Sequence, residues 1–253
     1  MTKRSITLSP KYSGNKEIRL LTEHLPEAFA SGKGDVLYDK RNKIHRFLLS
    51  DGTPVVVKQY KKPNFFQRIC YSTFWNNKAK KSFYFGQRLI SLHIDTPEPI
   101  ATVTYYNNIG MVEQYYFLST EDKRPDCLIL RDGNMDNPKP LADALAQYLI
   151  SLHQLGFLHG DTNLSNFLYE KNADGTFHFS VIDTNRSHFL NRPANKKEAL
   201  SNLMRLTHKR SLLSYLVRSY ALQRGWDAEE AEQTVFSLIE KRERKKRLLH
   251  LFK

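Results

Sequence analysis

The pattern of hydrophobic and polar positions predicts strands in the first half of the chain. Apolar residues at 43–49 and the β-branched run at 55–58 flank residues 51–52, Asp-Gly, which favour a tight hairpin turn. A second pair of strands is expected at 100–105 and 111–118. The first half of the chain is therefore expected to be rich in β-structure.

One helix is expected among these strands. Residues 77–92 place hydrophobic or small residues at helical spacing, at Phe83, Gly86, Leu89 and Ile90. Pro97 and Pro99 follow, and neither a proline nor the residue before it continues a helix comfortably. The helix is therefore expected to end before residue 96.

The second half of the chain predicts mainly helices. Residues 139–155 carry a stripe of leucines at helical spacing, and further helices are expected near 196–223 and 227–250. Between them, residues 167–170 and 177–182 have the pattern of a hairpin. Strands followed by helices predict an α+β fold with two lobes.

Composition excludes several classes of protein. Of the 253 residues, 40% are hydrophobic and 12% aromatic, which is too much for a disordered chain. No apolar run exceeds four residues, so no spanning helix is expected, and residues 1–6 precede no apolar signal segment. The two cysteines, Cys70 and Cys127, exclude a disulfide scaffold or a zinc ribbon and indicate a reducing compartment.

The net charge of +13 is concentrated in two stretches. Residues 59–94 contain no acidic residue and carry +7, and residues 241–247 carry +5, leaving about +1 for the rest. The first stretch suits either nucleic acid or an anionic membrane surface. The second either ends the last helix or docks on a membrane. The aromatic residues interleaved with the first stretch are Phe65, Phe66, Tyr71, Phe74, Trp75, Phe83, Tyr84 and Phe85.

The segment 156–186 carries the candidate chemistry. It places Asp161 and Asn166 in a loop after a helix, and Asp183 at the end of the hairpin, so that the three side chains are expected in one cleft. A carboxylate that orients a hydroxyl, together with oxygen ligands for Mg²⁺, is what phosphoryl transfer needs. Lys58, at the end of a predicted buried strand, has the character of a phosphate-binding lysine.

Other chemistries lack their motifs. The chain has no Gly-x-x-x-x-Gly-Lys-Ser/Thr loop and no Gly-x-Ser-x-Gly elbow. His153 and His159 are six residues apart rather than four, so a structural histidine is favoured over a zinc ligand.

These motifs resemble a known family. His159-Gly160-Asp161, with Asn166 five residues on and Asp183 after the hairpin, is similar to the loops of the protein-kinase-like fold. More narrowly, the chain resembles the bacterial lipopolysaccharide kinases, which phosphorylate Kdo or heptose on the lipid A carrier. The further motifs that carry this likeness are Val57-Lys58, Lys78-Ala79-Lys80-Lys81-Ser82, Thr96-Pro97-Glu98-Pro99-Ile100 and Ile182-Asp183-x-Asn185-Arg186.

The resemblance implies a role for each site residue. Asp161 would be the catalytic base, and Asn166 and Asp183 would bind Mg²⁺ and thereby the nucleotide. Lys58 would hold the phosphates of ATP, and His159 would brace the catalytic loop. The single kinase-like domain, 1–253, would comprise an ATP-binding N-lobe at 17–120 and a catalytic C-lobe at 121–253.

The expected function is ATP- and Mg²⁺-dependent transfer of phosphate to an alcohol group of a lipopolysaccharide core sugar or its Kdo-lipid A precursor. We expect a cytoplasmic protein at the inner face of the inner membrane, in peripheral contact with anionic lipid and without nucleic acid. Two alternatives stay open. One is a Ser/Thr protein kinase or small-molecule phosphotransferase, and the other is an inactive pseudokinase that binds membranes or nucleic acid.

The chain departs from protein kinases at three points. Asp183-Thr184-Asn185 replaces Asp-Phe-Gly, and residues 39–42 of the first hairpin stand where a Gly-rich loop is expected. The stretch 59–94 offers no glutamate to pair with Lys58, so Tyr84 or Gln87 is expected near it.

Overall fold

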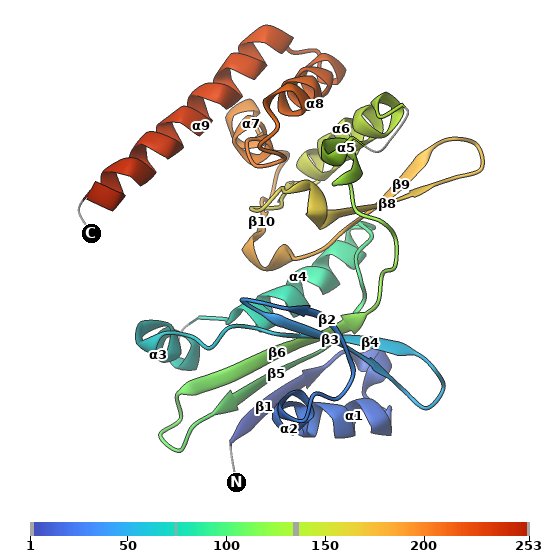
Figure 1. The fold of residues 1–253 in the computed structure, drawn as a ribbon, viewed down its shortest axis with the longest axis vertical. Coiled ribbons are helices and arrows are strands. Elements are labelled where there is room, and N and C mark those ends of the chain that lie inside the picture. The colour runs from blue at the N-terminus through green and yellow to red at the C-terminus, as the bar shows by residue number, and fades with distance from the viewer. Residues whose placement is uncertain (1–2, 74, 134–136, 252–253) are drawn as a thin grey trace. The chain divides into compact units, whose positions relative to one another are not determined.

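The computed structural model describes residues 3–73, 75–133 and 137–251 (Figure 1). The chain divides into two compact units, Met1–Lys123 and Arg124–Lys253. None of the helices in the described residues is long and apolar enough to cross a membrane.

The first unit is built on a six-stranded antiparallel sheet with the strand order β1-β5-β6-β4-β3-β2. The strands predicted at 43–49, 55–58, 100–105 and 111–118 are confirmed. The strands are β1 (Arg4–Leu8), β2 (Asp35–Asp39), β3 (Lys43–Leu48), β4 (Pro54–Gln59), β5 (Pro99–Tyr106) and β6 (Val112–Thr120).

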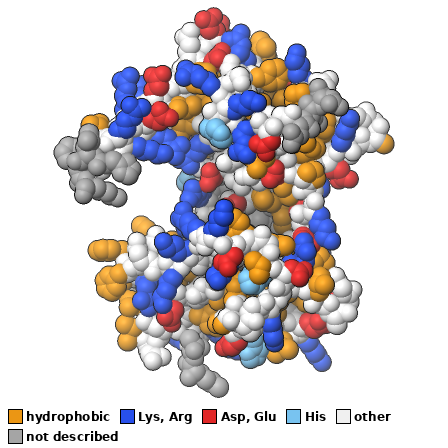
Figure 2. Space-filling model, in the orientation of Figure 1, with side chains coloured by type: hydrophobic (Ala, Val, Ile, Leu, Met, Phe, Trp, Pro, Cys, Tyr) orange, Lys and Arg blue, Asp and Glu red, His pale blue; other side chains and the backbone are white. Residues whose placement is uncertain are grey.

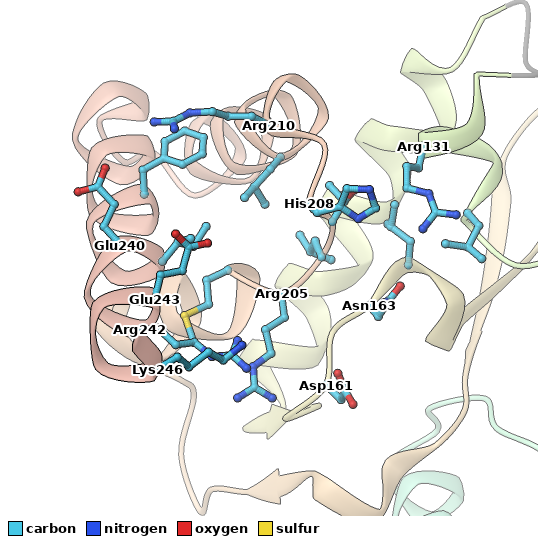
Figure 3. A pocket seen from close by; sticks show the side chains of 18 of the residues that line it. Arg131, Asp161, Asn163, Arg205, His208, Arg210, Glu240, Arg242, Glu243 and Lys246 are labelled. Carbon is cyan, nitrogen blue, oxygen red and sulfur yellow. The ribbon is translucent and has the colours of Figure 1, made fainter. Parts of the chain in front are cut away.

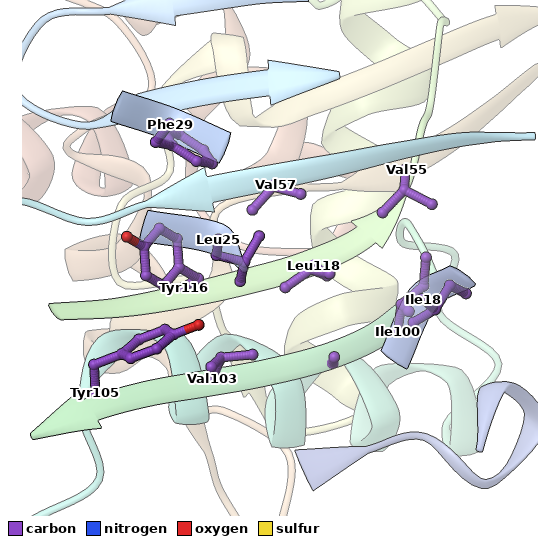
Figure 4. Packing of buried hydrophobic residues seen from close by; sticks show 11 residues of the cluster. Ile18, Leu25, Phe29, Val55, Val57, Ile100, Val103, Tyr105, Tyr116 and Leu118 are labelled. Atoms are coloured by element: carbon purple, nitrogen blue, oxygen red, sulfur yellow. The ribbon is translucent and has the colours of Figure 1, made fainter. Parts of the chain in front are cut away.

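Two short helices cover one face of this sheet, because side chains along a strand alternate between its faces. They are α1 (Lys16–Glu23) and α2 (Leu25–Ala30). Figure 4 shows their buried residues packed against the inward side chains of β4, β5 and β6. This cluster contains Ile18, Leu25, Phe29, Val55, Val57, Ile100, Ala101, Val103, Tyr105, Tyr116 and Leu118.

The opposite face carries α3 (Phe65–Thr73) and α4 (Lys78–Ser91). Tyr115 of β6 packs there with Tyr60 and Ala79. The next residue, Tyr116, points to the other face of the sheet. Asn77 caps α4, because its Oδ1 accepts from the Lys80 N–H at 3.0 Å. The predicted helix at 77–92 is confirmed, whereas α1, α2 and α3 were not predicted.

The second unit is mainly helical and holds two short antiparallel strand pairs. The predicted helix at 139–155 and the predicted hairpin are confirmed. The span near 196–223 contains two helices, since residues 204–209 separate them. The elements are α5 (Ile129–Asp132), α6 (Lys139–Gln154), α7 (Lys196–Leu203), α8 (Arg210–Gln223), α9 (Ala228–Leu251), β7 (Phe157–Leu158), β8 (Phe167–Lys171), β9 (Phe177–Val181) and β10 (His188–Phe189).

The predicted α+β fold is therefore confirmed, with a β-rich first unit and a mainly helical second unit. Helix α9 begins after Asp227, whose Oδ1 accepts from the Glu230 N–H at 2.7 Å, as its capping pattern predicts.

Gly86 sets the distance between α4 and β5. A Cβ on this residue would lie 2.5 Å from Cγ of the Pro99 ring, which begins β5. We expect Gly86→Ala to lower the free energy of unfolding by about 1–3 kcal/mol, because overpacking displaces the helix. Urea unfolding measures this loss. Lys81→Ala, at an exposed position of the same helix, should leave stability nearly unchanged, and equal effects would contradict the packing argument.

Candidate active site

His159 holds the loop that follows α6 against the end of β9. Its imidazole is buried, Nε2 lies 2.8 Å from the Ile182 carbonyl oxygen, and the Asp161 N–H donates to Nδ1 at 3.3 Å. Since Nδ1 accepts, the proton sits on Nε2 and is donated to Ile182. Burial lowers the pKa of His159, which keeps the ring neutral. The residue is therefore placed to brace the loop.

Gly160 allows a close approach that a side chain would prevent. Its φ of +68° lies in the left-handed region, and a Cβ would stand 2.1 Å from the Arg186 carbonyl oxygen. The Gly160 carbonyl accepts from the Arg205 guanidinium at 2.7 Å. The backbone of the loop is thus fixed from two sides.

The Asp161 carboxylate is half-exposed and oriented by Arg186. Arg186 Nη1 donates to Asp161 Oδ2 at 2.9 Å, and the described residues give Oδ1 no hydrogen bond. Meanwhile the Asp161 carbonyl accepts from the Asn166 side-chain amide at 2.8 Å and from the Asn163 N–H at 2.8 Å. One oxygen of a rigidly held carboxylate is therefore free to accept from a hydroxyl.

Asn166 and Asp183 stand at the open end of the β8–β9 hairpin. The Ile182 N–H donates to the Asn166 carbonyl at 3.0 Å, one step beyond the last strand pair of Phe167 with Val181. Asp183 has a left-handed backbone with φ of +56°, and its Oδ1 accepts from Asn185 Nδ2 at 2.5 Å. The hairpin thus places both residues beside the catalytic loop.

The available donors fit a magnesium ion. Because Asn166 donates through Nδ2, its Oδ1 remains an available oxygen ligand, and Asp183 supplies a carboxylate. Mg²⁺ uses one or two protein oxygens together with phosphates and water. No group of three His, Cys, Asp or Glu occurs in the part of the chain that the structure describes, so a metal held by protein ligands alone is not indicated there.

Lys58 lies in the central part of the sheet in the first unit. It pairs with Ile44 of β3 and Phe117 of β6, and its Nζ lies 5.2 Å from the centroid of the Tyr60 ring. The Tyr60 hydroxyl lies 2.7 Å from that of Ser82 in α4. The Tyr60 ring is thus one contact of the Lys58 ammonium group. Tyr84 is exposed and packs edge-on against Phe83.

His153 is a structural histidine, as its spacing from His159 predicts. It is buried at the end of α6, with Nδ1 2.8 Å from the Tyr220 hydroxyl and Nε2 3.1 Å from Oδ1 of Asn202. The carbonyl of Asn202 accepts from the hydroxyl of Thr162 in the catalytic loop. The histidine therefore supports the helical base on which the loop rests.

Three residues of the site received no role from the sequence. Arg186 and Asn185 stand in the motif after Asp183, and they hold Asp161 and Asp183 respectively. Arg205 lies just after α7 and reaches back to the loop. The first two could have been found from their place beside Asp183, whereas nothing in the local pattern marks Arg205.

Comparison with known proteins places this site in a family. Residues 133–233, which include all four site residues of the second unit, match the sequence model of the lipopolysaccharide kinase (Kdo/WaaP) family. The predicted resemblance to this family is confirmed over these residues. Lys58 lies outside the matched residues. No curated protein sequence matches the chain significantly.

Two solved structures are similar to the chain. WaaP in complex with acyl carrier protein has a TM-score of 0.56 and 18% identity, with 97% of this chain and 99% of WaaP covered. The Rio2 kinase from Chaetomium thermophilum, in an ADP/Mg²⁺-phosphoaspartate complex, has a TM-score of 0.48 and 17% identity, with 91% and 71% covered. The expected protein-kinase-like fold is therefore confirmed by WaaP.

The buried His153 predicts an acid-sensitive scaffold. Burial lowers its pKa to about 4, whereas the unfolded chain binds the proton near the ordinary value of 6.5. The unfolded state therefore gains protons first, and the free energy of unfolding should fall by up to about 1.4 kcal/mol per pH unit as pH drops from about 6.5 to about 4.

Urea unfolding across this pH range measures the slope. His153→Gln should flatten it, while His188→Gln, at an exposed position of the same unit, should not. An unchanged slope in His153→Gln would contradict the assignment.

Proposed function

We propose that the chain is an ATP-dependent kinase that phosphorylates a sugar hydroxyl, on Kdo or heptose, of the lipopolysaccharide core or its Kdo-lipid A precursor. The observation that supports this most directly is the Asp161 carboxylate, half-exposed and held by Arg186 inside the family-matched segment. A carboxylate fixed through one oxygen suits a base that must meet a hydroxyl in one orientation.

In the proposed reaction Asp161 Oδ1 accepts a hydrogen bond from the acceptor hydroxyl. As the hydroxyl oxygen bonds to the γ-phosphorus, the bond to the β-phosphate oxygen breaks, and the proton passes to Asp161. The products are a sugar phosphate and ADP. His159 keeps the loop in place through its bond to Ile182 and does not exchange a proton.

Three residues are proposed to contact the nucleotide or its metal ion. Lys58 binds phosphate oxygens by its charge, and Asn166 and Asp183 hold Mg²⁺ through their oxygens. Bound Mg²⁺ supplies charge neutralisation on the phosphates. Asn185 limits the movement of Asp183, which argues against the activation switch of a Ser/Thr protein kinase.

The basic first stretch is proposed to dock on the anionic cytoplasmic face of the inner membrane. In helix α3 the Tyr71 ring packs against Tyr115. The side chains of Phe65 and Phe66 are 62% and 78% exposed, and that of the nearby Trp75 is 65% exposed. Figure 2 shows exposed hydrophobic side chains beside Lys and Arg in the region where Figure 1 draws α3. Apolar tips beside cations are typical of interfacial helices.

Aromatic residues of helix α4 differ in exposure. Phe83 is buried in its inner face, whereas Tyr84 is exposed but lies outside α3. Phe74 lies outside the described residues. The proposed membrane surface is therefore confined to α3 and the residue that follows it at 75.

The role of Asp161 is tested by transfer of labelled phosphate from ATP to Kdo-lipid A. Asp161→Asn keeps the size of the side chain and removes the base, so we expect kcat to fall about 10²- to 10⁴-fold with the KM for ATP little changed. Asp174→Asn, in the exposed β8–β9 turn, is the matched control. Undiminished transfer by Asp161→Asn would reject the assigned base, and transfer to a protein or aminocyclitol instead would reject the acceptor class.

The membrane surface is tested by sedimentation with vesicles that contain phosphatidylglycerol. Phe65→Ala combined with Phe66→Ala should reduce binding about tenfold or more, because two aromatic side chains no longer enter the interface. Ile109→Ala removes an exposed apolar side chain from another hairpin and should have no effect. Vesicle binding that survives the double change, or salt-sensitive binding to RNA in its place, would contradict the proposal.

A further inference from the structure

A cavity of about 500 Å³ opens beside Asp161 within the second unit. Its walls come from the catalytic loop, the segment at 204–208 and helix α9 (Figure 3). This volume is typical of sites for small molecules or for the end group of a larger one. Asp161 lines the cavity, whereas Asn166 and Asp183 do not. The cavity thus reaches the proposed base without including the proposed Mg²⁺ ligands.

The lining of this cavity is strongly basic. Its six Lys and Arg residues are Arg131, Arg186, Arg205, Arg210, Arg242 and Lys246, against the acidic Asp161, Glu240 and Glu243. Three of the six have other contacts: Arg131 with Asp132, Arg186 with Asp161, and Arg210 over the Phe236 ring at 4.3 Å.

The other three cations gather on one side. Figure 3 shows Arg205, Arg242 and Lys246 next to one another, with Asp161 across from them. Among the residues that the structure describes, neither Arg242 nor Lys246 forms an ion pair, and Glu243 reaches Arg247 at 4.0 Å. These three cations, the basic cluster (Arg205, Arg242 and Lys246), are therefore held close together, and none of them forms an ion pair with another described residue, although Arg205 donates to the Gly160 carbonyl.

Clustering these charges costs free energy in the absence of a ligand. Arg205 and Arg242 are half-buried. Burial, and then the charge of Arg242, lowers the pKa of Arg205, while the charge of Asp161 raises it. Like charges so placed are stabilised when an anion binds between them.

Apolar residues form the rest of the lining. Leu206, Leu213, Phe236 and Ile239 lie beside the basic cluster. A ligand for this cavity therefore combines a negatively charged group with a less polar body, as an acidic or phosphorylated sugar does. The neighbouring cations Arg244 and Lys245 are exposed and do not line the cavity, so the cavity selects its cations from the helix.

We infer that the basic cluster binds an oxyanion of the acceptor, a carboxylate or a phosphate, and so presents the acceptor hydroxyl to Asp161. This inference rests on the proposed function and narrows it, because it makes a negatively charged acceptor the substrate class. Guanidinium groups bind two oxygens of such an anion in a plane and therefore fix its orientation as well as its position. A neutral glycan lacks this anchor.

The inference is tested by removing two cations from the cavity and two from the same helix outside it. The variant Arg242→Gln/Lys246→Gln should raise the KM for Kdo-lipid A about 10- to 100-fold, because two charge-assisted contacts are lost. Its kcat at saturating acceptor and its KM for ATP should change little. Arg244→Gln/Lys245→Gln removes the same charge and should match the wild type. Equal KM values for the two variants would overturn the inference.

The source of the anion is tested with modified acceptors. Esterification of the Kdo carboxylate or removal of the lipid A phosphates each deletes one candidate oxyanion. If a modified acceptor has the same KM with the wild type and with Arg242→Gln/Lys246→Gln, that acceptor has lost the group that the cluster binds. If the wild type keeps a lower KM than the variant with both modified acceptors, the cluster does not bind an acceptor anion and the inference is rejected.

A binding measurement separates failure of this inference from failure of the proposed function. With the nucleotide site filled by a non-hydrolysable Mg·ATP analogue, inorganic phosphate is titrated calorimetrically into the wild type and both variants. Binding that only Arg242→Gln/Lys246→Gln lacks supports the anion site even if no glycolipid is phosphorylated. Absence of binding in the wild type, or equal binding by both variants, counts against the site.

Discussion

The neutral imidazole of His159 is the contact on which the candidate active site depends. It joins two segments that are 23 residues apart, through the Asp161 N–H on one side and the Ile182 carbonyl on the other. Protonation would turn Nδ1 into a donor facing another donor, and burial opposes this. The relative position of Asp161 and Asp183 thus follows from one side chain that takes no part in the chemistry.

A second layer of contacts fixes the same loop to the helices. Thr162 bonds to Asn202 at the end of α7, and Leu164 bonds to Leu206 just beyond it. The segment that carries Arg205 is therefore attached to the catalytic loop at two points. Asp161 and one wall of the basic cavity share these attachments, so the proposed base and the proposed anion site are held in the same frame.

Much of the framework could be predicted from the sequence, because long periodic segments report their own structure. Strands β3 to β6 and helices α4 and α6 have this property, whereas α1, α2 and α3 are too short to show a clear period. Phe83 lies on the apolar side of the predicted helix and is buried, although it is also one of the aromatic residues among the charges. Its inward direction depends on the sheet beneath α4.

The interactions that complete the site could not be predicted for a different reason. Arg186 reaches Asp161 over 25 residues, and Arg205 meets Arg242 over 37 residues. These contacts depend on the pairing of β10 with β7 and on the path of α9 across the unit. Neither feature can be read from the local sequence pattern. The +5 charge at 241–247 predicted a helix end or a membrane contact, yet three residues of this stretch, two of them cations, line the cavity.

The bare α-carbon of Gly160 closes a mutational route. In protein kinases the corresponding motif is His-Arg-Asp, but here the Arg186 carbonyl occupies the space that the first atom of any side chain would need. A single codon change from glycine to arginine would also force a bulky residue into a left-handed backbone. Any side chain at position 160 therefore requires the segment around Arg186 to shift first.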